Sequence, residues 1–139
     1  MRPVPLVLLC SMLAAGGYGA EPTLPLAVVP RATVGRDQQV VWSRAAVLGP
    51  FVSSDGSGLP SASTVARLCR SDEQLLVRFD CAEPRLTELQ ATVTQRDGQV
   101  WTDDCVELFL QLPGQPSYAH FVVNPLGTAY DELDRDARW

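Results

Sequence analysis

The 139-residue sequence contains no lysine, no isoleucine and a single histidine. Its eleven cationic side chains are all arginines that form no basic run, and sixteen acidic side chains outnumber them, giving a net charge of −5. Proteins that bind nucleic acids through phosphates carry basic patches, so this composition argues against a nucleic-acid partner. The motif G-x-S-x-G is also absent, which removes the sequence signature of an α/β-hydrolase nucleophile.

A long apolar run is missing as well. The apolar stretch Val4–Ala15 is shorter than the ~20 residues that cross a bilayer as a helix. It follows the positively charged Arg2, and small residues occupy positions 14–17, 19 and 20 at its end, which is the layout of a secretory signal peptide. The sequence therefore predicts a signal peptide over residues 1–19, no membrane span, and a secreted, periplasmic or cell-surface protein.

Cysteine chemistry is limited once residues 1–19 are removed. The remaining cysteines are Cys69, Cys81 and Cys105, and the histidine is His120. Their spacing includes no C-x-x-C pair and no Cys/His cluster, which argues against a structural zinc site. An odd number allows one disulfide at most, and the spacings do not select a pair. A single histidine in a strand is typically a packed residue, so the sequence gives His120 no functional role.

Beyond a proline-rich lead-in at 20–30, the pattern is that of short strands separated by polar turns. The polar segment Ser71–Gln74 lies between two β-prone runs and predicts a hairpin centred on Asp72-Glu73. Only 83–94 offers a helical turn. These features predict an all-β, antiparallel β-sandwich domain over residues 31–139. The expected strands are 63–70, 75–81, 104–111, 118–124 and 128–133.

Alternation along these strands predicts which side chains share a face. One face of the hairpin is expected to carry Ala66, Leu68, Val77 and Phe79. The strand at 104–111 is expected to place one apolar row opposite a mixed row. The apolar row is Val106, Leu108 and Leu110, and the mixed row is Cys105, Glu107 and Phe109.

The segment 101–107 joins an aromatic residue to several acceptors, namely Trp101, Asp103, Asp104 and Glu107. A sugar ring has an apolar face that stacks on an indole, and its hydroxyls donate to carboxylates in charge-assisted hydrogen bonds. The segment therefore suggests sugar binding. The alternative is that Trp101 covers the core and the three acids are ordinary surface residues.

Four segments carry a resemblance to a known family. They are Trp42–Ala46 (W-S-R-A-A), the hairpin at 66–79, W-x-x-D-x-V-E-L-F at 101–109, and Y-x-x-F-x-V-N-P-x-G at 118–127. In this order they resemble the family 9 carbohydrate-binding modules of the DOMON-like superfamily, over roughly residues 30–139. The resemblance implies a jelly-roll-like β-sandwich that binds saccharides, often soluble sugars or the ends of xylan or cellulose chains. It implies no catalytic residues, and such modules commonly accompany secreted glycoside hydrolases.

The resemblance also assigns roles to individual residues. Trp101 would be a stacking aromatic, Glu107 a hydroxyl acceptor, and Asn124 a residue of the strand that lines the sugar site. Because calcium sites occur in the family, Asp103 and Asp104 are calcium candidates, although no cofactor is required.

The sequence departs from the family pattern in two places. Val122 stands where members with a sugar sandwich can carry an arginine donor, and the family's second stacking tryptophan lies further downstream. Trp139 does not match that position. The family also has more strands after this point, so we expect an incomplete sandwich whose unpaired edge favours poor solubility or dimerisation by strand addition.

Three other functions are less consistent with the sequence. A haem domain of the same superfamily would need Met and His ligands, yet both methionines lie in the predicted signal peptide. A glycosidase could pair Glu107 with Asp103 or Asp104, but no other feature supports catalysis. A structural or adhesion β-domain with packed tryptophans is the main alternative to sugar binding.

Overall fold

The computed structural model describes residues 27–35, 39–53 and 57–134. The predicted signal peptide and residues 20–26 of the lead-in lie outside the described residues. The described chain divides into two compact units, the first ending at Pro84 and the second beginning at Arg85. In the described ranges, no helix has the length and apolar character needed to cross a membrane.

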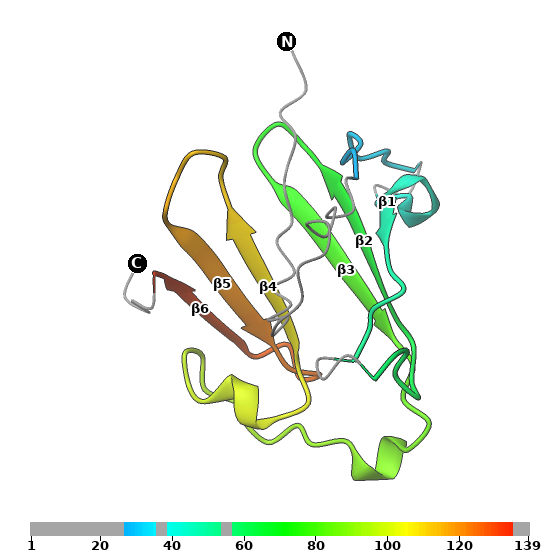
Figure 1. The fold of residues 1–139 in the computed structure, drawn as a ribbon, viewed down its shortest axis with the longest axis vertical. Coiled ribbons are helices and arrows are strands. Elements are labelled where there is room, and N and C mark those ends of the chain that lie inside the picture. Colours follow the sequence, from blue (N-terminus) through cyan, green and yellow to red (C-terminus); the bar gives the residue numbers. More distant parts are fainter. Residues whose placement is uncertain (1–26, 36–38, 54–56, 135–139) are drawn as a thin grey trace, which may run out of the picture. The chain divides into compact units, whose positions relative to one another are not determined.

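The first unit contains a three-stranded antiparallel sheet in the order β1-β2-β3 (Figure 1). Its strands are β1 (Ala46–Leu48), β2 (Thr64–Arg70) and β3 (Leu75–Cys81), and the short 3-10 helix η1 (Trp42–Arg44) precedes β1. Arg70 pairs with Leu75 across the hairpin, so the turn centres on Asp72-Glu73 as predicted. The Ser71 hydroxyl accepts the backbone N–H groups of Glu73 and Gln74, which closes the turn.

The register confirms the predicted face of this hairpin. Ala66 lies opposite Phe79, and Leu68 lies opposite Val77. Ala66 and Leu68 are buried, as expected for the apolar face of an antiparallel sheet. The three described cysteines are free thiols, and burial raises the pKa of the Cys69 thiol.

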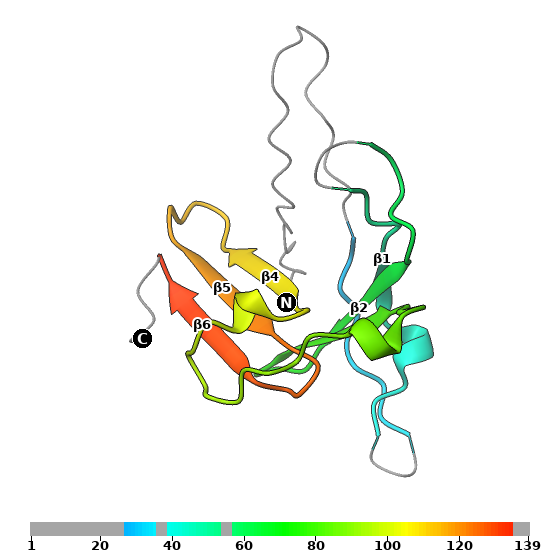
Figure 2. The same cartoon turned by 90° about the horizontal axis from the view of Figure 1, so that it is seen from below.

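The second unit contains another three-stranded antiparallel sheet, in the order β4-β5-β6 (Figure 2). Its elements are η2 (Leu86–Glu88), η3 (Val100–Thr102), β4 (Val106–Gln111), β5 (Tyr118–Val123) and β6 (Ala129–Leu133). The β4–β5 turn contains Gly114 and the β5–β6 turn contains Gly127, both with positive φ. Glycine suits these positions because it adopts positive φ without a steric penalty.

The two faces of the second sheet differ in character. Val106, Leu108 and Leu110 share one face of β4, while Glu107 and Phe109 lie on the other, as predicted. Residues of β5 and β6 join that second face through the strand register. We call it the Glu107 face, and its members are Glu107, Phe109, Gln111, Tyr118, His120, Val122, Tyr130 and Glu132.

These elements confirm the all-β, antiparallel fold class, and five of the six strands agree with the sequence prediction. The helical turn expected within 83–94 is the 3-10 helix η2. Strand β1 and helices η1 and η3 escape prediction from the sequence, because three residues are too few for a periodic pattern to be visible.

Candidate saccharide-binding face

The segment that leads into β4 is anchored by Asp103, which is largely buried. Its Oδ2 accepts the backbone N–H groups of Thr92 at 2.9 Å and Val93 at 2.8 Å, and its Oδ1 accepts the Thr92 hydroxyl at 2.9 Å. Asn124 Nδ2 donates to the same carboxylate at 2.9 Å. These donors, the Val93 N–H first, lower the pKa of Asp103 to about 2, because each favours the charged form.

The Asn124 side chain completes this buried cluster. Its Nδ2 also donates to the Val93 carbonyl at 2.8 Å, and its Oδ1 accepts the N–H groups of Leu126 and Thr128 at 3.1 and 2.9 Å. Asn124 is 4% exposed. Its amide is thus used to hold the β5–β6 turn against residues 92–93, so the predicted contact of Asn124 with sugar remains a prediction and this geometry does not support it.

The two calcium candidates do not converge on a shared site. Asp104 accepts the backbone N–H of Gln90 at 2.7 Å, whereas Asp103 faces Thr92, Val93 and Asn124. Among the residues that the structure describes, no group of three or more His, Cys, Asp or Glu side chains is arranged to hold a metal ion. The calcium hypothesis therefore gains no support. The hydrogen bonds of Asp103 and Asp104 described above are made with Gln90, Thr92, Val93 and Asn124, and not with Glu107.

Trp101 lies in η3, directly before the two anchored aspartates in the sequence. Val100 is fully buried and Asp103 is anchored, while Trp101 between them is 49% exposed. The Trp101 ring meets the Tyr130 ring edge to face, with centroids 5.0 Å apart and planes at 79°. The structure thus places the predicted stacking residue half-exposed beside Tyr130 of β6, rather than in the core.

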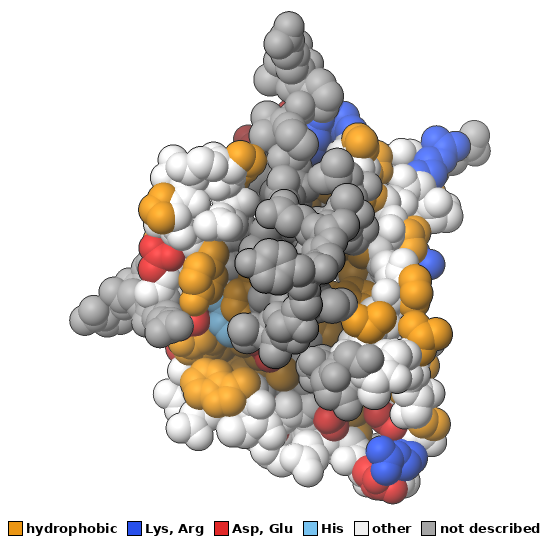
Figure 3. Space-filling view, in the orientation of Figure 1, with side chains coloured by type: hydrophobic (Ala, Val, Ile, Leu, Met, Phe, Trp, Pro, Cys, Tyr) orange, Lys and Arg blue, Asp and Glu red, His pale blue; other side chains and the backbone are white. Residues whose placement is uncertain are grey.

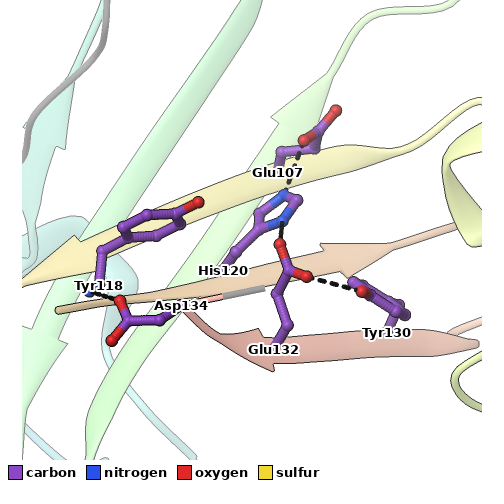
Figure 4. Close-up of polar contacts among 6 residues, drawn as sticks. All are labelled: Glu107, Tyr118, His120, Tyr130, Glu132 and Asp134. Carbon is purple, nitrogen blue, oxygen red and sulfur yellow. Dashed lines mark hydrogen bonds and ion pairs between the residues drawn. The ribbon is translucent and has the colours of Figure 1, made fainter. Parts of the chain in front are cut away.

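Glu107 lies at one end of a row of hydrogen-bonded side chains that crosses all three strands (Figure 4). Its Oε2 lies 2.8 Å from His120 Nε2, and the opposite ring nitrogen of His120 lies 3.1 Å from Glu132 Oε1. The Tyr130 hydroxyl donates to Glu132 Oε2 at 2.8 Å. This bond to Glu132 is the main reason why the pKa of Tyr130 is raised.

Aromatic rings fix the middle of this row. The His120 imidazole stacks on the Phe109 ring, with centroids 4.0 Å apart and planes at 5°. The Phe109 ring lies beside the Tyr118 ring, with centroids 5.9 Å apart. The backbone N–H of Tyr118 donates to Asp134 Oδ1 at 2.9 Å. His120 is therefore packed, as the sequence suggested, but it also joins two carboxylates, which the sequence did not predict.

The Glu107 face is mixed in chemistry. Figure 3 shows apolar and acidic side chains and the histidine close together over the β4–β6 sheet. Val122, opposite both Glu107 and Tyr130 in the register, is fully buried. Val122, which the resemblance places where some family members can carry an arginine donor, is thus an apolar support within the face and adds no polar side-chain contact.

Sequence reasoning identifies Trp101 and Glu107 but misses Tyr130, Glu132 and the role of His120. The missing information is the pairing register, which places His120 opposite both Phe109 and Glu132. The turn residues at 113–116 and 124–127 could have suggested that register, because turn length fixes pairing in a hairpin.

An antiparallel β-domain that exposes an indole beside carboxylate acceptors has the arrangement expected of a carbohydrate-binding module. Residues 59–138, more than half of the chain, match the model of the family described as carbohydrate-binding family 9. The chain belongs to that family, whose members are non-catalytic binding modules. No curated protein and no solved structure matches the chain.

Proposed function

We propose that Trp101 and the Glu107 face form the surface on which this chain binds a saccharide. The exposed indole of Trp101 would stack on the apolar face of a sugar ring. Glu107 has a side chain that is 44% exposed, and only its Oε2 faces His120. Its Oε1 can therefore accept a sugar hydroxyl in a charge-assisted hydrogen bond.

One observation carries this proposal, which is the unbroken row of contacts from Trp101 to Glu107. Trp101 contacts Tyr130, Tyr130 donates to Glu132, and His120 joins Glu132 to Glu107. Each member is held by its neighbour, so the stacking residue and the acceptor are positioned before a ligand arrives. Such preorganisation reduces the ordering cost of binding.

The charges of this surface favour a neutral sugar over an anionic one. The Glu107 face carries two carboxylates, those of Glu107 and Glu132, and none of its members is lysine or arginine. A uronic acid or sulfated sugar would bring a further negative charge close to these groups, which costs free energy. Ends of xylan-type or cellulose-type chains have neutral hydroxyl-rich rings and suit this surface.

The wider role that we propose is that of an exported accessory module. The signal-peptide pattern at 1–19 supports export, and membership of the family supports a non-catalytic role beside a glycoside hydrolase in the breakdown of plant polysaccharide. Carbohydrate binding by this face would then concentrate the chain on its substrate.

Calorimetric titration of xylo- and cello-oligosaccharides, with tryptophan fluorescence in parallel, tests the proposal. Trp101→Ala should weaken binding about thirtyfold or more, since truncating a central aromatic anchor costs about 2 kcal/mol. Glu107→Gln should weaken it about tenfold through the lost charge-assisted bond. Leu86→Ala, which removes an exposed apolar side chain outside the sheet, is the matched control and should bind like the unaltered chain.

The result that would contradict the proposal is equally clear. If a folded sample binds no neutral oligosaccharide, or if Trp101→Ala and Leu86→Ala bind alike, the Glu107 face is not the sugar site. Absence of all binding would favour a structural or adhesion domain.

A further inference from the structure

His120 is placed between two groups that can only accept hydrogen bonds. Its Nε2 lies 2.8 Å from Glu107 Oε2 and its Nδ1 lies 3.1 Å from Glu132 Oε1. An ionised carboxylate has no proton to donate, and a neutral imidazole carries a proton on one ring nitrogen only. Both contacts are therefore hydrogen bonds at the same time only when the imidazole is doubly protonated and positively charged.

The surroundings leave the ring little freedom to avoid this conflict. The imidazole stacks on Phe109 and its side chain is 13% exposed. Among the described residues, the titratable groups that face it are Glu107 from β4 and Glu132 and Tyr130 from β6. The Tyr130 ring meets the imidazole edge to face, with centroids 6.3 Å apart, and its hydroxyl bonds to the far oxygen of Glu132. The raised pKa of Tyr130 keeps its hydroxyl protonated, so it donates to Glu132 throughout the range near pH 5–8 in which histidines titrate.

The two carboxylates differ in how well water can replace the imidazole. The Glu132 side chain is 14% exposed, whereas that of Glu107 is 44% exposed. A buried anion loses more free energy than an exposed one when its donor is removed. A neutral imidazole should thus keep its proton on Nδ1, towards Glu132, and turn the lone pair of Nε2 towards Glu107. That lone pair repels the carboxylate, which is free to move into water.

We propose that His120 is a positioning residue for Glu107, holding its carboxylate for a sugar hydroxyl only while the imidazole is protonated. This inference rests on the proposed function. Saccharide affinity then falls as the pH rises through the titration of His120. The expected loss is about two- to tenfold, the effect of having to order one rotamer-rich side chain on binding.

The first experiment uses the sugar-free protein. His120 is the only histidine in the chain, so the imidazole nitrogen signals in an NMR titration from pH 5 to 8.5 all belong to it. We expect two protonated ring nitrogens at low pH and retention of the Nδ1 proton at high pH. The carboxyl carbon signal of Glu107 should change with the same midpoint as the imidazole.

The second experiment measures affinity for a neutral oligosaccharide over the same pH range in three variants. Asn and Gln amides can imitate one ring nitrogen without titrating, and His120→Gln places its amide donor near the position of Nε2. It should bind with little pH dependence and close to the low-pH affinity. His120→Asn places the donor nearer to Nδ1 and should bind weakly at every pH.

Glu132→Gln provides the matched control for the competition between the two carboxylates. The amide can donate to Nδ1 while accepting from Tyr130, so a neutral imidazole can direct its single proton to Glu107. This variant should retain the low-pH affinity at high pH. A merely structural role for His120 would not produce this rescue or the contrast between Gln and Asn.

Flat affinity across the titration of His120 in the unaltered chain would overturn the inference, as would equal pH dependence in Glu132→Gln. A Glu107 signal that ignores the imidazole titration would also overturn it. Absence of saccharide binding at every pH refutes the proposed function instead, because the sugar-free NMR titration still decides whether His120 holds Glu107.

Discussion

Replacing Asn124 by Asp is the sharpest test of the buried cluster, because the change is isosteric and removes only donors. The Asn124 amide donates to the Val93 carbonyl and to the Asp103 carboxylate, at 2.8 and 2.9 Å. A carboxylate at position 124 donates to neither and brings a second negative charge next to Asp103. The two acceptor contacts to the N–H groups of Leu126 and Thr128 are kept.

The magnitude follows from these contacts. A hydrogen bond in a protein contributes about 0.5–1.5 kcal/mol, and more when one partner is charged. Removing both donors at a 4% exposed position should therefore lower the free energy of opening this unit by about 3 kcal/mol, before repulsion is counted. That change corresponds to about a hundredfold in an equilibrium constant.

Amide hydrogen exchange measures this opening locally. The N–H groups of Thr92 and Val93, which donate to Asp103, should exchange about a hundred times faster in Asn124→Asp. Gln115→Glu makes the same chemical change in the exposed β4–β5 turn and should alter stability by less than about 0.5 kcal/mol. Lowering the pH towards 4 should partly restore the variant, because a protonated carboxyl at 124 can donate to Asp103. Unchanged exchange at Thr92 and Val93 would refute this account of the cluster.

Two further predictions concern the same unit. The pKa of Asp103 is lowered to about 2, so its ionised form stabilises the folded state above pH 4, and this contribution is lost as the pH falls towards 2. Acid unfolding followed by circular dichroism should show this loss of stability in the unaltered chain and not in Asp103→Asn. The same loss in Asp103→Asn would contradict the assignment. Gly127 has φ of +79°, and a Cβ at this position would have nothing within 4 Å of it. Gly127→Ala should therefore lower the free energy of unfolding by about 1 kcal/mol from backbone strain alone, and Gly127→Asn should lower it less, as measured by urea unfolding. Equal losses in the two variants would argue against strain.

Much of the sheet structure could be predicted from the sequence because period-two alternation reports both the strand and its buried face. The hairpin around Asp72-Glu73 and the apolar row Val106, Leu108 and Leu110 are confirmed for that reason. Strand β1 could not be found in this way, since three residues are too few to show alternation and their partners in β2 are distant in the sequence.

The site was predictable only in part. Trp101 and Glu107 stand out as chemical types in one short segment, so the sequence suggested them. Asp103 looked equally accessible, yet its environment is set by the backbone of Thr92 and Val93, ten and more residues away. These contacts depend on how the irregular segment around residues 92–93 passes the start of β4. Such a segment has no periodic pattern, so the sequence does not reveal its path.

Asp103 and Glu107 illustrate how one acidic segment divides into two roles. Asp103 is buried and bonded to backbone N–H groups, so its charge stabilises the entry to β4 and is not available to a ligand. Glu107, four residues later and on the exposed face of β4, is held by a side chain that can lose its proton. Trp101 is two residues before Asp103, so we expect its position to depend on that anchor. Loss of sugar affinity in a variant of Asp103 or Asn124 would therefore report a displaced Trp101, and only substitutions at Trp101 and Glu107 themselves report direct contact with the sugar.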